Sequence, residues 1–550
     1  MMSASDEIIH HPIIGPIRGT KNSLGVVQFL GVQYATLEDR FARGVLKEYY
    51  PKEGDTLDAT QLGPISLSPL DGCELEHKLI QKDLPHPAYT QSDTECLTLN
   101  IATPVVKHPQ ELPVLVLIHG GGYVTGSSSY PHYDLSRITK QSVEIGMPLI
   151  AVGVNYRLGA PGFLFSSAMK EAGYKPNNGL DDQRLAFRWI RRYLAGFGAD
   201  SKRVTCIGES AGGASAFFHL HSAEPLFDQL VSMSGTTLLR PRLPQFLQKA
   251  FRKVVEGLGV QSTSSEEQIR TLLDISMDQL REHASPRLSL GPMVDGDIIP
   301  RTTTYQELSE GKPERLFPGI AHCNRIIIGD CQSDSLVFAN QFATRTDILP
   351  KTLGRYLSVT LDPVDSTLAP AILAAYRIDP SIISNTPESL ERVLDLGNDI
   401  AFAEPARAFT RAWAGSSIAD TEAMLYHFDC PNPWEGPGKG RALHIQDIAY
   451  LLLNFREYLS PGQQQSANRL ANDIIAFSNG KSPWAAYQNH SAEKAMVYYS
   501  PVVGDKDCST FGSNVAPEYT GRRRILQQVV RVELLDKVLD AWQMFMAGPL

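Results

Sequence analysis

Ser210 stands in the pattern Gly-Glu-Ser-Ala-Gly, between an apolar run that predicts a β-strand and small residues that predict a helix. A sharp turn from strand to helix strains the backbone at the serine, so the positions two before and two after it need almost no side chain. Gly208 and Gly212 meet that need. The following helix would direct free N–H groups toward Ser210, where negative charge develops during nucleophilic attack. The pattern predicts a nucleophilic serine; an ordinary Gly/Ser turn is the alternative.

A serine hydroxyl attacks a carbonyl only when an imidazole accepts its proton and a carboxylate orients the imidazole. With a serine turn of this kind, the acid and then the histidine follow the serine in the sequence. His444 follows a Gly- and Pro-rich segment, 433–440, and precedes the apolar run 448–453. A loop beyond a late strand is well placed to bring a base to the serine. We therefore predict His444 as the base, with a surface loop histidine as the alternative.

Two aspartates follow the apolar run 325–328 and could orient that imidazole. The run ends in Gly-Asp-Cys-Gln-Ser-Asp, which contains Asp330 and Asp334. A carboxylate just beyond the C-terminal end of a strand is well placed for a site at the edge of the sheet. Either aspartate could instead cap the next helix. These residues alone do not distinguish Asp330 from Asp334.

Three glycines, 120–122, follow the apolar run 113–118. Consecutive glycines let backbone N–H groups approach a substrate closely, as an oxyanion hole requires. We predict that the N–H groups of Gly121, Gly122 and Ala211 hold the oxyanion, each contributing roughly 3 kcal/mol at the transition state. A flexible turn is the alternative.

The elements that must position these residues follow from the hydrophobic pattern. Apolar runs alternate with amphipathic segments, which predicts right-handed crossovers and a mostly parallel sheet flanked by helices. No internal repeat and no Gly/Ser linker divides residues 1–550, so we expect a single domain. The predicted strands cover 97–101, 113–118, 148–155, 204–207, 227–234, 325–328 and 423–428, with antiparallel strands within 13–36, a loop over 60–95, a helix over 179–194, helices over 240–290, a helical insertion around 346–420, and terminal helices over 466–480 and 522–546. The basic run 522–524 is expected to be a solvated helix end.

Charge and composition exclude several classes of function. The chain has 550 residues and a net charge of −9, which argues against nucleic-acid binding. Its N-terminus lacks the basic start and apolar segment of a secretory signal, and no apolar run is long enough to span a bilayer. Seven cysteines without metal-type spacing suit a reducing compartment. We expect a cytoplasmic protein without metal, cofactor, nucleic acid or membrane span.

Several motifs together resemble the type-B carboxylesterase/lipase family, which includes the cholinesterases, and in particular its fungal members without a signal peptide. The resemblance implies an α/β-hydrolase fold and hydrolysis of small-molecule carboxylic esters through an acyl-enzyme. It covers nearly the whole chain. Its motifs lie at 28–35, 92–100, 120–122, 155–157, 179–183, 208–213 and 329–338.

The resemblance also implies roles for individual residues. The family acid lies five positions beyond the glycine that ends the strand, which is Asp334 here; the family more often has Glu followed by Gly at this place. Glu209, Ser234 and Asp447 match positions that the family links in a polar network beneath the base. Such a network would restrain the imidazole and tune its pKa. Satisfied local polar residues are the alternative for each of the three.

Two features bear on the substrate and on the cysteines. Cholinesterases place a tryptophan in a loop before this Glu-Cys-Leu motif to hold a quaternary ammonium. Residues 73–96 contain no Trp, so choline esters are not expected as substrates. Cys73 and Cys96 match a disulfide of secreted relatives, and we expect both to be reduced.

Two other functions fit the same residues. The acyl group could pass to an acceptor other than water, or come from a thioester or amide, as in the tailoring of a secondary metabolite. A non-catalytic hydrolase-like binding protein is the second alternative. The presence of a serine, an acid and a histidine in the expected order disfavours this binding function.

Overall fold

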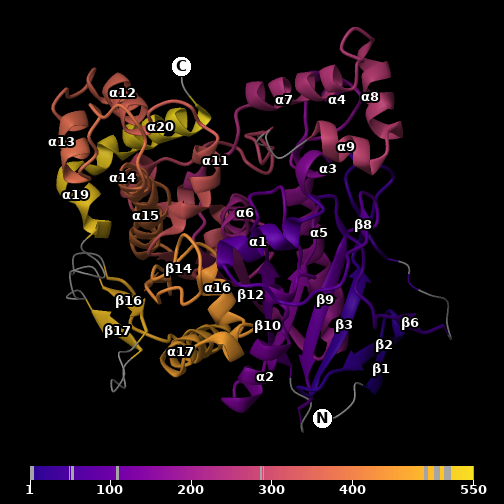
Figure 1. Cartoon of the computed structure of the whole chain (residues 1–550). Helices are drawn as coiled ribbons and strands as arrows, with labels where there is room; N and C mark the ends of the chain where they lie inside the picture. The colour runs from indigo at the N-terminus through magenta and orange to yellow at the C-terminus, as the bar shows by residue number, and fades with distance from the viewer. Residues whose placement is uncertain are drawn as a thin grey trace.

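A large β-sheet forms the centre of the molecule (Figure 1). The computed structural model describes residues 5–48, 50, 55–106, 111–284, 288, 290–488, 494–500, 508–512 and 522–548. The sheet has 13 strands in the order β1-β2-β3-β9-β11-β10-β12-β13-β14-β15-β16-β17, with β6 beside β2. Its middle strands are parallel, which confirms the predicted sheet; they are β11 (Ile150–Val154), β10 (Leu112–Ile118), β12 (Ala199–Glu209), β13 (Gln229–Met233), β14 (Arg325–Cys331), β15 (Glu422–Phe428) and β16 (Ala495–Tyr498).

Antiparallel strands close both edges of the sheet. The N-terminal edge is the antiparallel group predicted within 13–36, extended by one further strand at each side. These strands are β1 (Ser5–His11), β2 (Gly15–Lys21), β3 (Val26–Gln33) and β9 (Thr98–Pro104), with β17 (Ser509–Gly512) at the other edge. The remaining short strands are β4 (Ala35–Thr36), β5 (Val45–Leu46), β6 (Leu57–Asp58), β7 (Ile65–Ser66) and β8 (Gln91–Ser92).

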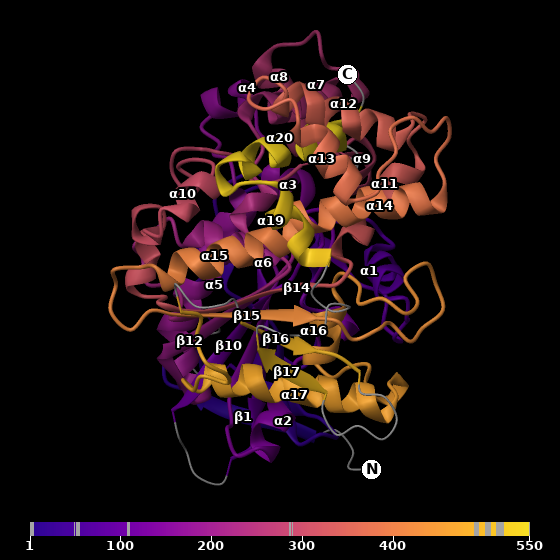
Figure 2. The ribbon, with the colours of Figure 1, turned by 90° about the vertical axis from the view of Figure 1, so that its left-hand side faces the viewer.

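Helices cover both faces of the sheet, because successive side chains of a buried strand point to opposite sides. Val114 and Val116 of β10 belong to the core beneath α5 and α15, whereas Leu115 and Leu117 belong to the core beneath α2 and α17. Figure 2 shows these two layers on opposite sides of the sheet. The helices of these layers are α5 (Asn178–Tyr193), α6 (Ala211–His219), α15 (Glu404–Ala414), α2 (Ser136–Glu144), α16 (Gln446–Leu451) and α17 (Pro461–Ser478).

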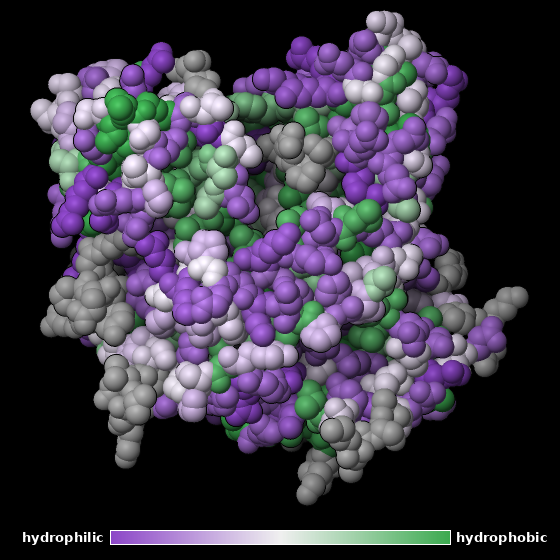
Figure 3. Space-filling model, in the orientation of Figure 1, coloured by the Kyte–Doolittle hydropathy of each residue, from purple (hydrophilic) through white to green (hydrophobic). Residues whose placement is uncertain are grey.

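Two further groups of helices stand side by side at one end of the molecule, and Figure 3 shows a hollow between them. One group contains α3 (Gly159–Phe163), α4 (Ser167–Glu171), α7 (Pro244–Gly257), α8 (Ser265–Asp274) and α9 (Met277–His283). The other contains α11 (Ala339–Ala343), α12 (Leu349–Leu361), α13 (Leu368–Ala375), α14 (Pro387–Asn398), α19 (Ile525–Val529) and α20 (Leu535–Ala547). The short α10 (Tyr305–Ser309) contacts α15 and α20. The predicted helical insertion is therefore confirmed, and the C-terminal helix α20 packs against it.

The prediction of a loop over 60–95 is wrong in part, because this stretch contains α1 (Gly72–Ile80) together with β7 and β8. The buried face of α1 carries Cys73, Glu76, His77 and Ile80. These positions have helical spacing. Glu76 and His77 are polar, so the buried face is not visible as an apolar stripe in the sequence.

The expectation of a solvated basic helix end at 522–524 is also wrong for Arg523. Its side chain is buried, and it donates to Asp330 at 2.6 Å and to Asp429 at 2.8 Å. Two carboxylates at the ends of β14 and β15 therefore hold this arginine inside the protein. Within the described ranges, no helix is long and apolar enough to cross a membrane.

Candidate active site

The backbone turns sharply at Ser210, between the end of β12 and the start of α6. Ser210 has φ 53° and ψ −117°, a conformation that non-glycine residues seldom adopt. Neighbouring backbone packs tightly around it: a Cβ on Gly208 would lie 2.3 Å from Gly212 O, and a Cβ on Gly235 would lie 1.9 Å from Ser210 O. Only glycine fits these positions, so the strained turn expected from the sequence is present.

His444 and Asp334 meet beside this turn, although 110 residues separate them in the sequence. His444 lies in the loop between β15 and α16, and Asp334 begins the 3-10 helix η7 (Asp334–Phe338). Their atoms Nδ1 and Oδ1 are 2.7 Å apart, and both side chains are buried. The other carboxylate oxygen of Asp334 accepts the Cys331 N–H at 2.8 Å. Asp334 is thus fixed by the backbone on one side and orients the imidazole on the other.

Asp330, the other candidate acid, belongs to a different cluster. It contacts His427 Nδ1 at 2.5 Å and accepts from Arg523 at 2.6 Å. Burial would raise the pKa of Asp330, but the charges of Arg523 and His427 hold it well below its usual range. Asp330 of β14 and Asp334 of η7 therefore have separate partners, and of these two only Asp334 contacts His444.

Glu209 lies next to Ser210 in the chain and close to the imidazole in space. Its Oε1 is 3.3 Å from His444 Nε2, and neither carboxylate oxygen has a hydrogen-bond partner among the described residues. Burial raises the pKa of Glu209 to about 8, although His444 opposes this. Burial alone would lower the pKa of His444, but Asp334, Glu209 and Asp447 raise it to about 9. Three acidic side chains therefore lie close enough to the imidazole to affect its pKa.

The other two residues of the predicted network lie beneath this cluster. Asp447 accepts from Tyr426 Oη at 2.7 Å, and burial raises its pKa to about 6. Ser234 has φ 51°, and its buried hydroxyl has no hydrogen-bond partner in the described part of the chain. Asp447 therefore acts on His444 through its charge.

The glycine loop after β10 lies against the serine turn. Gly121 and Gly122 have φ 85° and 62°, which favour glycine, and a Cβ on Gly120 would lie 2.0 Å from Glu209 Oε2. The N–H groups of Gly121 and Gly122 have no acceptor among the described residues. Ala211 opens α6, where the N–H groups have no intrahelical acceptor. This arrangement can offer three amide donors to an anion.

Sequence reasoning missed the aromatic residues around these groups. Tyr123, with φ 66°, donates its hydroxyl to Ala211 O at 2.9 Å. The ring of Phe402 lies 5.4 Å from that of His444, and Phe338 lies 5.8 Å from Phe402. Tyr123 directly follows the glycine run, and this position was the signal that could have placed it near the site. Phe402 lies far from any motif, so the sequence contained no signal that places it there.

A mostly parallel sheet with a serine at a strained strand-to-helix turn defines the α/β-hydrolase fold. The sequence profile described as "Carboxylesterase family" matches residues 5–489, so the chain belongs to the carboxylesterase family. The para-nitrobenzyl esterase of Bacillus subtilis (strain 168) is 28% identical over 514 residues, which cover 88% of this chain and 93% of that protein.

Two further similarities agree with the family. A mouse (Mus musculus) cholinesterase is 32% identical over 247 residues, covering 42% of this chain and 39% of that protein. A solved structure of PNB esterase superposes with a TM-score of 0.72 at 25% identity, covering 94% of this chain and 100% of the other. The predicted fold class and reaction class are confirmed: the protein is a serine hydrolase of the carboxylesterase family that acts on carboxylic esters.

Proposed function

We propose that the enzyme cleaves esters through an acyl-enzyme formed on Ser210, with His444 as the base and Asp334 orienting it. The hydrogen bond of 2.7 Å between buried His444 and Asp334, beside the strained serine turn, is the observation that carries this proposal. A bound carboxylate holds the imidazole in the tautomer whose Nε2 can accept the serine proton. Ser210 Oγ then adds to the ester carbonyl carbon.

The oxyanion that forms is held by the N–H groups of Gly121, Gly122 and Ala211. Free backbone donors at a helix start and a glycine loop support this role. The alcohol leaves with the proton from His444, which produces the acyl-enzyme. A water molecule, deprotonated by His444, releases the carboxylic acid and restores Ser210. We propose that no metal and no organic cofactor takes part in these steps.

Glu209 is proposed to hold the imidazole when no substrate is bound. With its pKa raised to about 9, His444 is protonated at neutral pH. Its Nδ1 then lies against Asp334, and its Nε2 lies against Glu209. The base form requires loss of the Nε2 proton. Glu209 thereby sets the pH at which the enzyme becomes active, and Ser234 and Asp447 complete the polar surroundings.

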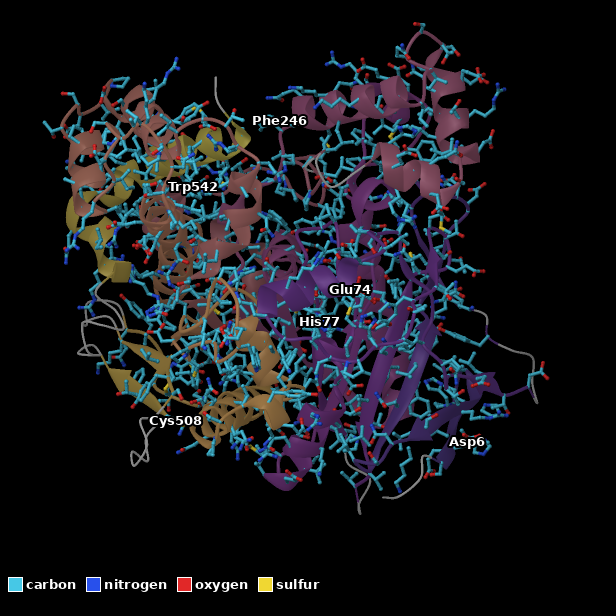
Figure 4. The ribbon with its side chains drawn as sticks, in the orientation of Figure 1. Asp6, Glu74, His77, Phe246, Cys508 and Trp542 are labelled. Carbon is cyan, nitrogen blue, oxygen red and sulfur yellow. The ribbon has the colours of Figure 1, made fainter. Side chains whose placement is uncertain are left out.

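We propose that the substrates are small esters with an apolar group. Phe402 lies beside His444, Phe338 lies beside Phe402, and Tyr123 packs against Phe163 with ring centroids 5.0 Å apart. Figure 4 labels Phe246 on α7 and Trp542 on α20, which belong to the two neighbouring helix groups; Phe246 is exposed and Trp542 is buried. Aromatic walls favour apolar ligands and bind them with few polar contacts. Choline esters are not expected, because residues 73–96 lack a Trp.

Three further predictions stay proposals. A single domain is supported by one sheet that takes strands from β1 to β17. A cytoplasmic location depends on the amino-acid sequence alone. A closer relation to fungal carboxylesterases without a signal peptide also depends on the amino-acid sequence alone.

A fluorophosphonate probe and a chromogenic ester test the proposed nucleophile. Wild-type enzyme should form one adduct on Ser210, and Ser210→Ala should lose both the adduct and turnover while keeping its circular dichroism spectrum. Ser309→Ala, which changes an exposed serine, is the matched control. Wild-type turnover by Ser210→Ala would contradict the proposal. Product analysis with added alcohols or amines distinguishes hydrolysis from acyl transfer.

A further inference from the structure

A cysteine and two histidines converge at α1, outside the serine site. Cys73 and His77 are one helical turn apart, so their side chains lie on the same face of α1. His86 reaches this face from the loop that follows the helix. One donor atom from each of the three residues lies within 4.8 Å of the others, and Cys73 Sγ is 3.9 Å from His77 Nε2. Figure 4 shows His77 and Glu74 on α1, at the front of the molecule.

We propose that Cys73, His77 and His86 bind one zinc ion, with Glu74 as the fourth ligand. Zinc prefers a tetrahedral set of sulfur, nitrogen and carboxylate ligands, which is the set present here. In such a site the ligand atoms are about 3.3–3.6 Å apart, given the usual zinc–sulfur and zinc–nitrogen distances. Small side-chain rotations therefore close the observed cluster around the ion.

The surroundings of both histidines suit metal binding through Nε2. His86 Nδ1 lies 3.0 Å from Pro87 O, so the proton of the neutral ring belongs on Nδ1 and the lone pair on Nε2. The ring of His86 also stacks on Tyr89, with centroids 5.4 Å apart. His77 Nδ1 faces the Asp83 carboxylate at 3.8 Å. A carboxylate or carbonyl behind a ligating imidazole is the usual second partner of zinc histidines.

Glu74 supplies an independent indication of a missing partner. Its Oε1 is 3.6 Å from His86 Nε2, and its buried Oε2 has no hydrogen-bond partner among the described residues. A buried carboxylate oxygen without a donor is costly, and a bound cation would satisfy it. The side chain of His86 is 21% exposed, which leaves an entry path for the ion.

This site differs from the disulfide implied by the family resemblance. Cys73 is a free thiol beside His77, in the core beneath α2 and α17. Cys96 is a free thiol in the core beneath α5 and α15, on the opposite face of the sheet. The expectation that the chain binds no metal considered the spacing of cysteines alone. The spacing of cysteines does not reveal a site made of one cysteine and two histidines.

The ion would act on the serine site through α1, as a positioning element. A Cβ on Gly121 would lie 3.0 Å from Glu76 Oε1, so α1 packs against the glycine loop. Gln81, which ends α1, accepts from Asn432 in the loop that leads to His444. Binding zinc would tie the 82–86 loop to α1 and stabilise the helix between these two loops.

Metal binding to the full-length chain, stripped with a chelator, tests the proposal. We expect one zinc or cobalt(II) ion per chain, a thiolate-to-cobalt absorption band, and a higher melting temperature with zinc. Cys73→Ser should abolish the band, and His86→Ala and Glu74→Gln should each weaken zinc binding at least about 10-fold. His322→Ala, which changes an exposed histidine far from α1 in the sequence, is the control and should bind like wild type.

Absence of stoichiometric binding by wild-type protein with native circular dichroism would overturn the proposal. Equal zinc affinity in wild type, Cys73→Ser and His86→Ala would also overturn it. Because His86 is partly exposed, His86→Ala is expected to fold even if Cys73→Ser does not. Unchanged affinity in Glu74→Gln alone would overturn the assignment of the fourth ligand.

Discussion

His444 Nε2 lies 3.3 Å from Glu209 Oε1, on the side of the imidazole opposite Asp334. Two buried carboxylates thus face the two ring nitrogens of one histidine. Each favours the charged imidazolium, which explains why the pKa of His444 is raised to about 9 despite burial. Glu209, which precedes the proposed nucleophile, therefore helps to raise the pKa of the proposed base.

Glu209→Gln should move the acid limb of the pH–activity profile to lower pH. The carboxylate raises the pKa of His444, so its loss lowers that pKa and leaves the neutral base present at lower pH. We expect a shift of about 1 unit or more in the profile of kcat/KM. Glu435→Gln, an exposed change in the loop before His444, is the control. An acid limb at the wild-type pH would show that Glu209 does not set the pKa of the base.

Asp334→Asn should lower kcat by about 10⁴-fold, because an amide favours the wrong tautomer of the imidazole. Substrate binding should change little, since Asp334 lies behind His444. Steady-state kinetics measure kcat and KM. Asp362→Asn, an exposed change in the helical insertion, should behave like wild type. A loss of less than 10-fold in Asp334→Asn would reject this residue as the orienting acid.

Arg523→Ala should destabilise the fold by about 3–5 kcal/mol, because it leaves two buried carboxylates without their cation. Asp330 and Asp429 both accept hydrogen bonds from this arginine. Urea denaturation measures the change in the free energy of unfolding. Arg531→Ala removes an exposed arginine and should change that free energy by less than about 0.5 kcal/mol. Similar stability of the two variants would contradict the buried network.

Gly235→Ala should abolish activity and reduce stability by at least about 2 kcal/mol. The added Cβ would lie 1.9 Å from Ser210 O, and the backbone of the serine turn would have to move. Activity and thermal unfolding measure the two effects. The matched change Gly354→Ala lies within α12, where the nearest atom to a Cβ is Pro380 Cβ at 3.3 Å. That variant should remain active, and activity in Gly235→Ala would show that the turn tolerates a side chain.

The amino-acid sequence determined the fold class and the position of Ser210, because both depend on local signals. Buried strands are continuous apolar runs, and a strained serine turn needs glycines at fixed spacing. The glycine loop after β10 was visible for the same reason. These features need no knowledge of which distant segments meet.

The residue types alone did not distinguish the two aspartates; the family resemblance implied Asp334, and the tertiary structure shows that Asp334 is the one that contacts His444. Asp330 and Asp334 are chemically alike and four residues apart, but Asp330 faces Arg523, 193 residues away, and Asp334 faces His444, 110 residues away. The buried face of α1 and the burial of Arg523 could not be predicted from the amino-acid sequence either. Polar groups are stable inside a protein only with their partners, and partners distant in sequence are set by how the sheet and its loops pack.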